Sequence, residues 1–281
     1  MSLATTEALN LNHTATLNND TYLRAAEVIS NADSLLIFAG SGMNADSGVP
    51  DFKNDLGLWG DSFLFNGMTL ANWFIKEPKH AWGFYGFLHQ LYKQTKPHAG
   101  FSILKKWCEN KPSDSFIYTS NTDGHFQSSG FAEEMIYECH GSINLTQCTQ
   151  ACTNEVFHTQ ILPINMDNQQ LLPQGKIPTC SYCGNISRPN ILMLKDLYWL
   201  DSQYQKQHQR FQQWKNVTIK KKVAIIELGV GTSGFSIRHE SRQSQGTLIR
   251  INPYEPEGNK DILPIRSGAC NALQILDALL N

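Results

Sequence analysis

The chain has 281 residues, 17% of them charged, and a formal net charge of −2. This length favours one large hydrophobic core that carries a smaller module. The near-neutral charge argues against direct nucleic-acid binding, and no apolar run reaches the roughly 20 residues that span a bilayer. Because the N-terminus also lacks the pattern of a secretion signal, the sequence predicts a cytoplasmic protein without a membrane partner.

Apolar and amphipathic segments alternate along the chain after a tail, residues 1–20, that is rich in Asn and Thr and predicted to be flexible. The alternation of strand-like and helix-like segments predicts an α/β fold with a doubly wound, Rossmann-like parallel sheet. The predicted strands are Leu35–Ala39, Phe116–Thr119, Met135–Tyr137, Val223–Leu228 and Thr247–Ile251, and the predicted helices are Tyr22–Ser30, His80–Tyr92, Phe101–Cys108, Tyr204–Trp214 and Ala269–Leu280.

Two segments interrupt this alternation. Residues 57–100 are aromatic and helix-like, and residues 148–188 are polar and contain two cysteine pairs. We expect them to form a small domain that combines a helical insertion with a metal-binding module. Residues 21–56, 101–147 and 189–281 are then expected to form the Rossmann-like large domain.

A glycine-rich turn follows the first predicted strand, with the sequence GSGMNADSG at residues 40–48. Glycines in such a turn let the backbone approach a pyrophosphate group. Glycine-rich turns after strands are also common without any ligand, and this one is not the dehydrogenase fingerprint. The sequence VPDFK at residues 49–53 then places a proline, a carboxylate and an aromatic ring directly after the turn.

Polar motifs follow two further predicted strands. SNTDG at residues 120–124 could form a simple turn, because Asn and Asp are common turn residues. ECHGS at residues 138–142 carries His140, whose side chain suits a general base because an unperturbed histidine has a pKa of about 6.5. A single histidine is more often structural than catalytic. This motif is therefore informative mainly because it occurs in order with the other motifs of the chain.

Four cysteines form two pairs, one with three intervening residues and one with two. Four thiolates suit one structural Zn²⁺ ion in tetrahedral geometry, whereas a catalytic zinc needs an open position for water. The alternative is two pairs of unrelated thiols. The predicted metal ligands are Cys148, Cys152, Cys180 and Cys183.

The motifs, taken in order, resemble those of the sirtuin family from about Leu35 to Leu280. Residues 40–53 resemble G-A-G-x-S-x-x-x-G-I-P-D-F-R, residues 120–123 resemble Q-N-I-D, and residues 138–142 resemble E-L-H-G-S. RPNILMLKD at residues 188–196 resembles the substrate loop R-P-x-V-V-x-F-G-E, and residues 231–233 and 251–252 resemble the G-T-S and I-N steps.

The resemblance implies an NAD-binding large domain and a catalytic group made of His140, as general base, with Asn121 and Asp123. It implies NAD as cofactor, together with one structural Zn²⁺. The cofactor-binding residues implied are Gly40, Ser41, Gly42, Asn44, Asp51, Phe52, Lys53, Ser120, Asn121, Asp123, Gly231, Thr232, Ser233, Asn252 and Ala269.

The activity implied by the resemblance is NAD-dependent deacylation of lysine in an acylated protein or peptide. The acyl oxygen would attack the ribose carbon as nicotinamide leaves, and the products would be nicotinamide, free lysine and O-acyl-ADP-ribose. Two alternatives stay open: ADP-ribosyl transfer or NAD hydrolysis on the same fold, and binding of NAD or ADP-ribose without turnover. The sequence leaves the acyl-chain preference and the oligomeric state open.

The chain also departs from the family pattern at several positions. Asn44, Lys53 and Ser120 stand where the family has Ser, Arg and Gln, and the arginine-to-lysine change loses a bidentate donor. Leu194, Lys195 and Asp196 replace the Phe, Gly and Glu of the substrate loop. His125 stands at the family's leucine position and is therefore not a candidate base.

Overall fold

A computed structural model describes residues 20–49, 70–160, 162–167, 170–232, 235–259 and 261–281. The chain divides into two compact units. The first unit is built from the residues up to Asp46, from His98–Tyr118 and from Gln213–Asn281, and the second from Ser47–Pro97 and Thr119–Gln212. In the described part of the chain, no helix is long and apolar enough to cross a membrane.

The two compact units do not have the same boundaries as the domains expected from sequence. Residues 119–147 and 189–212 belong to the second compact unit, whereas the sequence analysis assigned them to the Rossmann-like domain. The units record which residues contact one another most, and the domain bounds stay a prediction.

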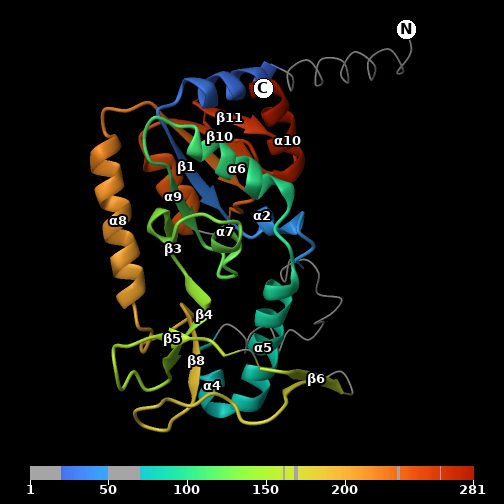
Figure 1. The fold of residues 1–281 in the computed structure, drawn as a ribbon, viewed down its shortest axis with the longest axis vertical. Helices are drawn as coiled ribbons and strands as arrows, with labels where there is room; N and C mark the ends of the chain where they lie inside the picture. Colours follow the sequence, from blue (N-terminus) through green and yellow to red (C-terminus); the bar gives the residue numbers. More distant parts are fainter. Residues whose placement is uncertain (1–19, 50–69, 161, 168–169, 233–234, 260) are drawn as a thin grey trace. The chain divides into compact units, whose positions relative to one another are not determined.

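The first unit contains strands of a parallel sheet in the order β11-β10-β9-β1-β2. Figure 1 labels β11, β10 and β1 of this sheet. The strand pairs β1 with β9, β9 with β10 and β10 with β11 are parallel. All residues of β1 and β9 are buried, which explains their nearly continuous apolar sequences. The strands are β1 (Ser34–Ala39), β2 (Phe116–Thr119), β9 (Val223–Leu228), β10 (Thr247–Ile251) and β11 (Ile262–Ile265).

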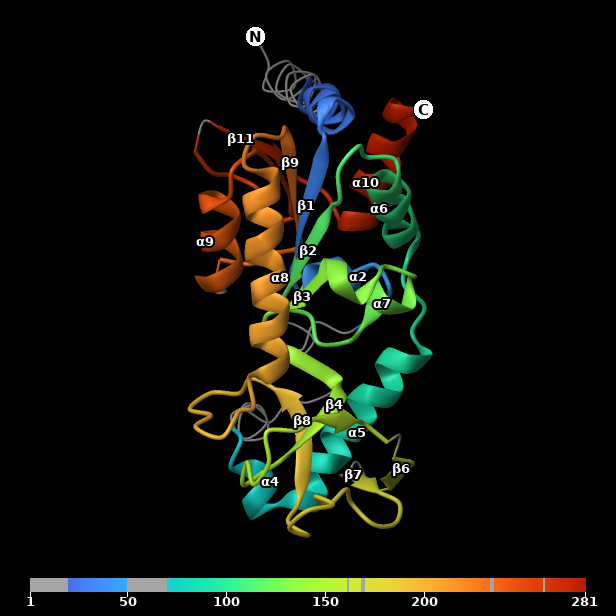
Figure 2. The same ribbon diagram turned by 60° about the vertical axis from the view of Figure 1, so that its left-hand side comes forward.

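Helices cover both faces of this sheet, as the alternating sequence predicts. Figure 2 shows α6 (Ala99–Glu109) and α10 (Ala269–Leu280) on one face and α9 (Phe235–Gln243) on the other. The indole of Trp107 in α6 donates to Asp277 Oδ1 in α10 at 2.8 Å. A further helix covers residues 20–31, and the short α2 (Gly42–Ala45) follows β1. The doubly wound α/β fold is therefore confirmed.

The second unit has a long helix packed against small antiparallel sheets (Figure 2). The indole of Trp82 in α5 donates to the Ser187 carbonyl in β8 at 2.7 Å. Aromatic residues around Phe74, Trp82 and Tyr85 form the core, and they lie on two helices within the segment 57–100 that is aromatic and helix-like in sequence. The elements are α4 (Trp73–Lys76), α5 (Pro78–Gln94), β4 (Gly141–Cys148), β5 (Phe157–His158), β6 (Ile164–Asp167), β7 (Gln170–Pro173) and β8 (Ser187–Ile191).

Short elements at the other end of this unit carry the polar motifs. After β2 come α7 (His125–Ser128), η1 (Glu133–Met135) and β3 (Ile136–Glu138). The long helix α8 (Ser202–Thr218) begins in this unit, and its Phe211 and His208 contact the ring of Tyr137 in β3. These contacts fix the position of β3, which ends two residues before the predicted catalytic histidine, His140.

Candidate functional site

The glycine turn after β1 lies against the loop that follows β9. The Gly42 amide donates to the Gly229 carbonyl at 3.0 Å. A Cβ on Gly40 would lie 2.7 Å from the Gly229 oxygen, and one on Gly42 would lie 2.8 Å from the Gly229 Cα. Only glycine fits at these two positions, because the two loop backbones pack directly on each other.

This pair of loops lies at the point where the strand order reverses. From β1 the chain proceeds to β2 on one side, whereas β9, β10 and β11 lie on the other side. In open parallel sheets, ligands bind outside the carboxyl ends of the strands at such a reversal. Ser41, Gly231 and Thr232 are exposed at this end, so these small residues are accessible from the solvent.

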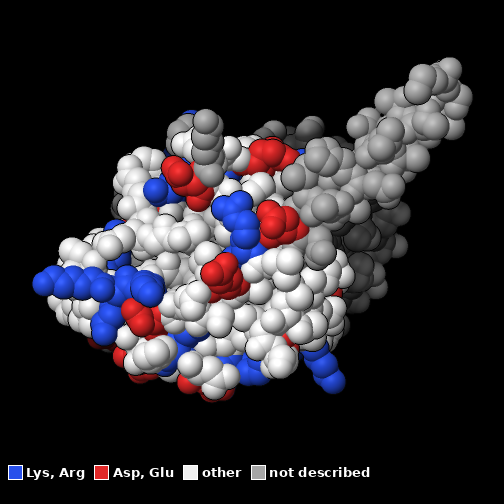
Figure 3. Space-filling model, turned by 90° about the horizontal axis from the view of Figure 1, so that it is seen from above, with Lys and Arg blue, Asp and Glu red and all other residues white. Residues whose placement is uncertain are grey.

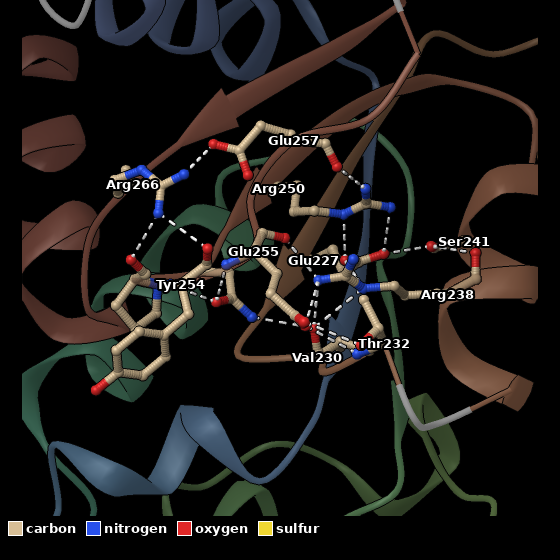
Figure 4. Close-up of polar contacts among 12 residues, drawn as sticks. Glu227, Val230, Thr232, Arg238, Ser241, Arg250, Tyr254, Glu255, Glu257 and Arg266 are labelled. Atoms are coloured by element: carbon tan, nitrogen blue, oxygen red, sulfur yellow. Dashed lines mark hydrogen bonds and ion pairs between the residues drawn. The ribbon is translucent and has the colours of Figure 1, made fainter.

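The loop after β9 is fixed by hydrogen bonds to the side chains of Arg238, Asn252 and Glu255 (Figure 4). The Val230 carbonyl accepts from Arg238 Nε at 3.1 Å, from Arg238 Nη2 at 2.7 Å and from Asn252 Nδ2 at 3.0 Å. The Glu255 carboxylate accepts from the amide and the hydroxyl of Thr232, each at 3.0 Å. The predicted cofactor residues Thr232 and Asn252 are therefore parts of one hydrogen-bonded group.

A buried ion pair lies beneath this loop. Arg250 Nε contacts Glu227 Oε1 at 2.5 Å, and Ser241 Oγ donates to Glu227 Oε2 at 2.5 Å. Arg238 Nε lies 3.6 Å from Glu227 Oε1, so the same carboxylate also faces the arginine that holds the loop. Removing one partner of such a pair leaves an uncompensated buried charge.

The sequence analysis missed this group of residues, although the sequence carries a signal for it. Glu227 and Arg250 are the only charged residues in the apolar strands β9 and β10. They are also direct partners in the strand register. A charge of opposite sign in each of two buried neighbouring strands indicates an ion pair, because buried charges need partners.

The remaining predicted cofactor residues of the first unit lie around the start of α10. The amide of Cys270 donates to Asp46 Oδ2 at 2.7 Å, which joins the first turn of α10 to the end of the glycine turn. Ala269 and Asn44 are buried on the two sides of this connection. Asp51, Phe52, Lys53 and Ser233 lie outside the described residues.

In the second unit, the polar turn after β2 is built by its own side chains. The Asn121 amide donates to Thr119 Oγ1 at 3.0 Å, and the His125 amide donates to Asp123 Oδ1 at 2.7 Å. Asp123 is buried, and Gly124 has a φ of 77°, a backbone conformation that favours glycine. The turn therefore fixes Asp123 at the start of α7, with Ser120 and Asn121 partly exposed beside it.

His140 occupies the tight turn between β3 and β4. Gly141 has a φ of 78°, and a Cβ there would lie 2.0 Å from the Asn190 carbonyl oxygen. The His140 carbonyl accepts from the Leu192 amide at 2.9 Å. Burial lowers the pKa of His140 below its ordinary value, and a backbone hydrogen bond with Ser120 opposes this shift. The imidazole is thus neutral at pH 7 and can accept a proton.

The loop after β8 keeps the backbone shape that a glycine would favour. Lys195 has a φ of 56°, which is uncommon for a residue with a side chain. Its neighbour Asp196 forms a buried ion pair with Arg188, with Nη2 to Oδ2 at 2.6 Å and Nη2 to Oδ1 at 2.8 Å. The buried ion pair between Arg188 and Asp196 therefore stabilises the loop that contains the substituted residues 194–196.

The four predicted zinc ligands lie together in the second unit. Their sulfur atoms are all within 4.8 Å of one another, with Cys148 Sγ 3.6 Å from Cys183 Sγ and Cys152 Sγ 3.5 Å from Cys180 Sγ. The Gly184 amide donates to the Cys180 carbonyl at 2.9 Å, which closes the turn that carries the second pair. This spacing fits four thiolates around one tetrahedral zinc ion.

Comparisons with known proteins agree with these features. The model of the Sir2 family matches residues 40–217. The chain is 26% identical to an NAD-dependent protein deacylase of Aquifex aeolicus, over 79% of this chain and 84% of that protein. It is 29% identical to a probable bifunctional ADP-ribose hydrolase/ADP-ribosyltransferase of Fusarium oxysporum f. sp. cubense, over 74% of this chain but only 37% of that protein.

Solved structures share the fold. A mutant Sir2 homologue in complex with ADP-ribose superimposes with a TM-score of 0.69 at 19% identity, over 92% of this chain and 95% of that chain. A Sir2 homologue in complex with NAD gives a TM-score of 0.67 at 20% identity, over 91% and 93%. Together with the matched family model, which covers more than half of the sequence, these likenesses establish that the chain belongs to the Sir2 family.

Proposed function

We propose that the chain is an NAD-dependent protein lysine deacylase. The observation that carries the proposal is His140, a half-buried and neutral imidazole in a rigid turn of the same unit as the buried carboxylate of Asp123. A group of this kind accepts a proton near neutral pH. The Aquifex aeolicus and Clostridium perfringens relatives are named NAD-dependent protein deacylase and deacetylase.

The roles of the residues follow from the two units. In the first unit, the loops after β1, β9 and β10 would bind NAD, whose bond to nicotinamide is the bond that is broken. In the second unit, His140 would accept a proton from a ribose hydroxyl, while Asn121 and Asp123 would line the ribose and nicotinamide. The acceptor would be an acylated lysine of a protein or peptide; one solved relative is a Sir2 protein bound to an acetylated peptide.

The zinc ion would have a structural role. Four cysteine thiolates fill a tetrahedral shell and leave no position for a reacting water molecule. Cys148, Cys152, Cys180 and Cys183 would hold the ion and thereby fix the polar segment between β4 and β8.

Nucleic acid is not expected among the partners. Basic and acidic side chains are interspersed on the face drawn in Figure 3, without a large basic patch there. A mixed surface of this kind lacks the field that attracts a phosphate backbone. Location in the cytoplasm stays a prediction from the sequence.

The proposal is tested by nicotinamide release from NAD, measured with and without an acetyl-lysine peptide, with the peptide mass followed in parallel. We expect release that depends on the peptide, loss of the acyl mass, and no release by His140→Ala. A wild-type protein that releases no nicotinamide would exclude the deacylase and favour NAD binding without turnover.

The second candidate function is ADP-ribosyl transfer. It is favoured by the name of the Fusarium relative and by the altered substrate loop, in which Leu194 and Lys195 are exposed. The same experiment separates the two activities. Nicotinamide release with an unchanged peptide mass, accompanied by transfer of labelled ADP-ribose to protein, would support the transferase.

A further inference from the structure

His98, the N-cap residue of α6, contacts two elements of the first unit through the two nitrogens of its ring. Its Nδ1 atom accepts a hydrogen bond from the Gly100 amide, in the first turn of α6, at 3.0 Å. Its Nε2 atom lies 2.8 Å from the Met43 carbonyl oxygen, in the short helix α2 that follows the glycine turn. One imidazole ring therefore joins the start of α6 to α2.

These two contacts determine where the ring carries its proton. A ring nitrogen that accepts from an amide has no proton, so the proton of the imidazole is on Nε2. The Nε2–H group then donates to the Met43 carbonyl at a distance normal for a hydrogen bond. A protonated imidazolium has two donors and could not accept from Gly100. His98 therefore makes both bonds only as the neutral ring with its proton on Nε2.

The ring of His98 is also held by packing. Its centroid lies 5.0 Å from that of the Phe101 ring. A Cβ at Gly100 would lie 2.6 Å from His98 Cε1 and 2.8 Å from Leu273 Cδ1 in α10, so glycine leaves the room that the ring needs against the first turn of α6. The imidazole is thus kept in one orientation, with Nε2 directed at α2.

α2 is attached to the first turn of α10 as well. Asp46, which directly follows α2, accepts from the Cys270 amide through Oδ2 at 2.7 Å. A Cβ at Gly268, the N-cap of α10, would lie 3.2 Å from both Asp46 carboxylate oxygens, so this carboxylate takes the place of a capping side chain. Figure 2 shows α2 near the lower ends of α6 and α10. The position of α2 is therefore set by the first turns of two helices.

The position of α2 in turn sets the backbone of the glycine turn. Gly42 belongs to the glycine turn and is also the first residue of α2. Its amide donates to the Gly229 carbonyl, and the Met43 amide donates to the Gly40 carbonyl, both at 3.0 Å. A displacement of α2 would therefore move the turn after β1 as well. In doubly wound folds, the backbone of the turn after the first strand approaches the pyrophosphate of a dinucleotide.

We infer that His98 is a positioning residue for the predicted NAD-binding turn. Its Nε2–H group holds α2, and with α2 the backbone of the turn after β1, in the geometry that receives the pyrophosphate. The inference rests on the proposed function for the identity of the ligand. The two bonds of the ring have separate effects: the Nδ1 bond stabilises α6, and the Nε2 bond determines the affinity for NAD.

Two substitutions separate these bonds. Asparagine places its side-chain oxygen near the position of Nδ1 and is a good N-cap, so His98→Asn keeps the bond to Gly100 and loses the bond to Met43. Glutamine is longer and places its amide group near the position of Nε2, so His98→Gln keeps a donor for Met43 and loses the cap. His80→Asn is the matched control, because His80 is exposed and lies in α5 of the second unit.

The Kd for NAD is measured by calorimetry and stability by thermal melting, both on the full chain. For His98→Asn we expect the Kd to rise about three- to tenfold, the effect of one neutral hydrogen bond, with an unchanged melting temperature. For His98→Gln we expect the melting temperature to fall by about 2–4 °C, with a Kd within about twofold of the wild type. His80→Asn should bind NAD as the wild type does. A wild-type Kd in His98→Asn, or a Kd that follows the melting temperature in both His98 variants, would overturn the inference.

A second readout needs no ligand. Long-range proton–nitrogen correlation spectra of the protein show which nitrogen of His98 carries the proton, and we expect Nε2. A proton on Nδ1 would refute the inference, because the ring could then not accept from Gly100 and donate to Met43.

The activity assay separates the inference from the proposed function. In His98→Asn the KM for NAD should rise while kcat changes less than about twofold, as when binding is lost equally from the ground state and the transition state. A lower kcat with an unchanged KM would overturn the inference. A wild type that binds NAD and releases no nicotinamide would refute only the proposed function, since the comparison of Kd values needs no turnover. A wild type that does not bind NAD would refute both.

Discussion

Burial of the Glu138 carboxyl group makes the stability of the fold depend on pH. The pKa of this group, about 7 in the folded protein, lies above the value of 4.5 for a free glutamate. The stabilisation that this shift represents is fully present below about pH 4.5 and is lost as pH rises through 7. We expect Glu138→Gln to unfold less readily than the wild type above pH 7, with a gain on the order of 2–3 kcal/mol.

Urea unfolding at pH 5, 6, 7 and 8 checks this prediction. The difference in the free energy of unfolding between variant and wild type should favour the variant increasingly from pH 5 to 8. Because Glu134→Gln alters an exposed carboxylate, its difference from the wild type should stay small at every pH. A difference for Glu138→Gln that does not depend on pH would show that the carboxyl does not titrate in this range.

Lys195 carries a side chain where the backbone favours glycine. Its φ of 56° costs a residue with a Cβ on the order of 1 kcal/mol. We expect Lys195→Gly to leave stability unchanged or raise it by up to about 1 kcal/mol, because the relief of strain is partly offset by the greater freedom of glycine in the unfolded chain. Thermal melting measures the change.

The control for Lys195 is Leu197→Gly. Leu197 lies in the same loop, is 90% exposed, and does not have a positive φ. Its replacement should therefore destabilise the protein slightly, since it adds freedom to the unfolded chain without relieving strain. If both variants lose the same stability, the backbone at residue 195 is not strained.

At the scale of elements, the sequence predicted the apolar strands well. Phe116–Thr119, Val223–Leu228 and Thr247–Ile251 were predicted with the bounds that the structure has, because each is a short buried run between polar turns. The helix predicted over Ala269–Leu280 is also confirmed. The other predicted helices are longer in the structure by one to several residues at their ends, where the sequence no longer shows the periodic apolar pattern.

Other elements could not be predicted from local sequence. β11 contains Pro264 and lies at the edge of the sheet, a position where the missing amide of proline is tolerated. The β6–β7 hairpin is short and packs against α5. Among the candidate site residues, the motifs indicated Asp123 and His140 directly, whereas Arg238 gains its role only because the fold places its side chain against the loop after β9.

The contact between α5 and β7 gives a prediction about Gly83. Alanine in place of glycine usually stabilises a helix by up to about 1 kcal/mol. Here a Cβ would lie 1.9 Å from the Leu171 carbonyl oxygen, so the hairpin backbone would have to move. We expect Gly83→Ala to lower the free energy of unfolding by about 1–3 kcal/mol, as overpacking does. Chemical denaturation measures the loss.

Gly86→Ala is the matched control in the same helix. Its Cβ would meet the end of the Ile164 side chain at 2.6 Å, and a side chain can rotate away where a backbone cannot. The loss should therefore be clearly smaller than for Gly83→Ala. Equal stability of the two variants would contradict the packing of β7 on α5.

At the scale of the whole molecule, both units are assembled from segments that are far apart in the chain. In the first unit, β1 at residues 34–39 pairs with β9 at residues 223–228. In the second, β4 pairs with β8 some forty residues later, and the cysteine cluster is formed by the last residue of β4 and three residues of the segment between the two strands. Zinc should therefore stabilise this pairing, because metal that binds only the folded site contributes its binding energy to folding.

Loss of zinc should consequently affect the two units unequally. In Cys180→Ser we expect the metal content to fall below one ion per chain, and amide hydrogen exchange to become faster in β4 and β8. The strands β1, β9 and β10 should keep their protection, since their pairing involves no cysteine ligand. Cys270→Ser makes the same change outside the cluster and should leave the metal content and the exchange rates as in the wild type. Uniform loss of protection in both units of Cys180→Ser would instead mean that the chain unfolds as one cooperative body, with zinc stabilising all of it.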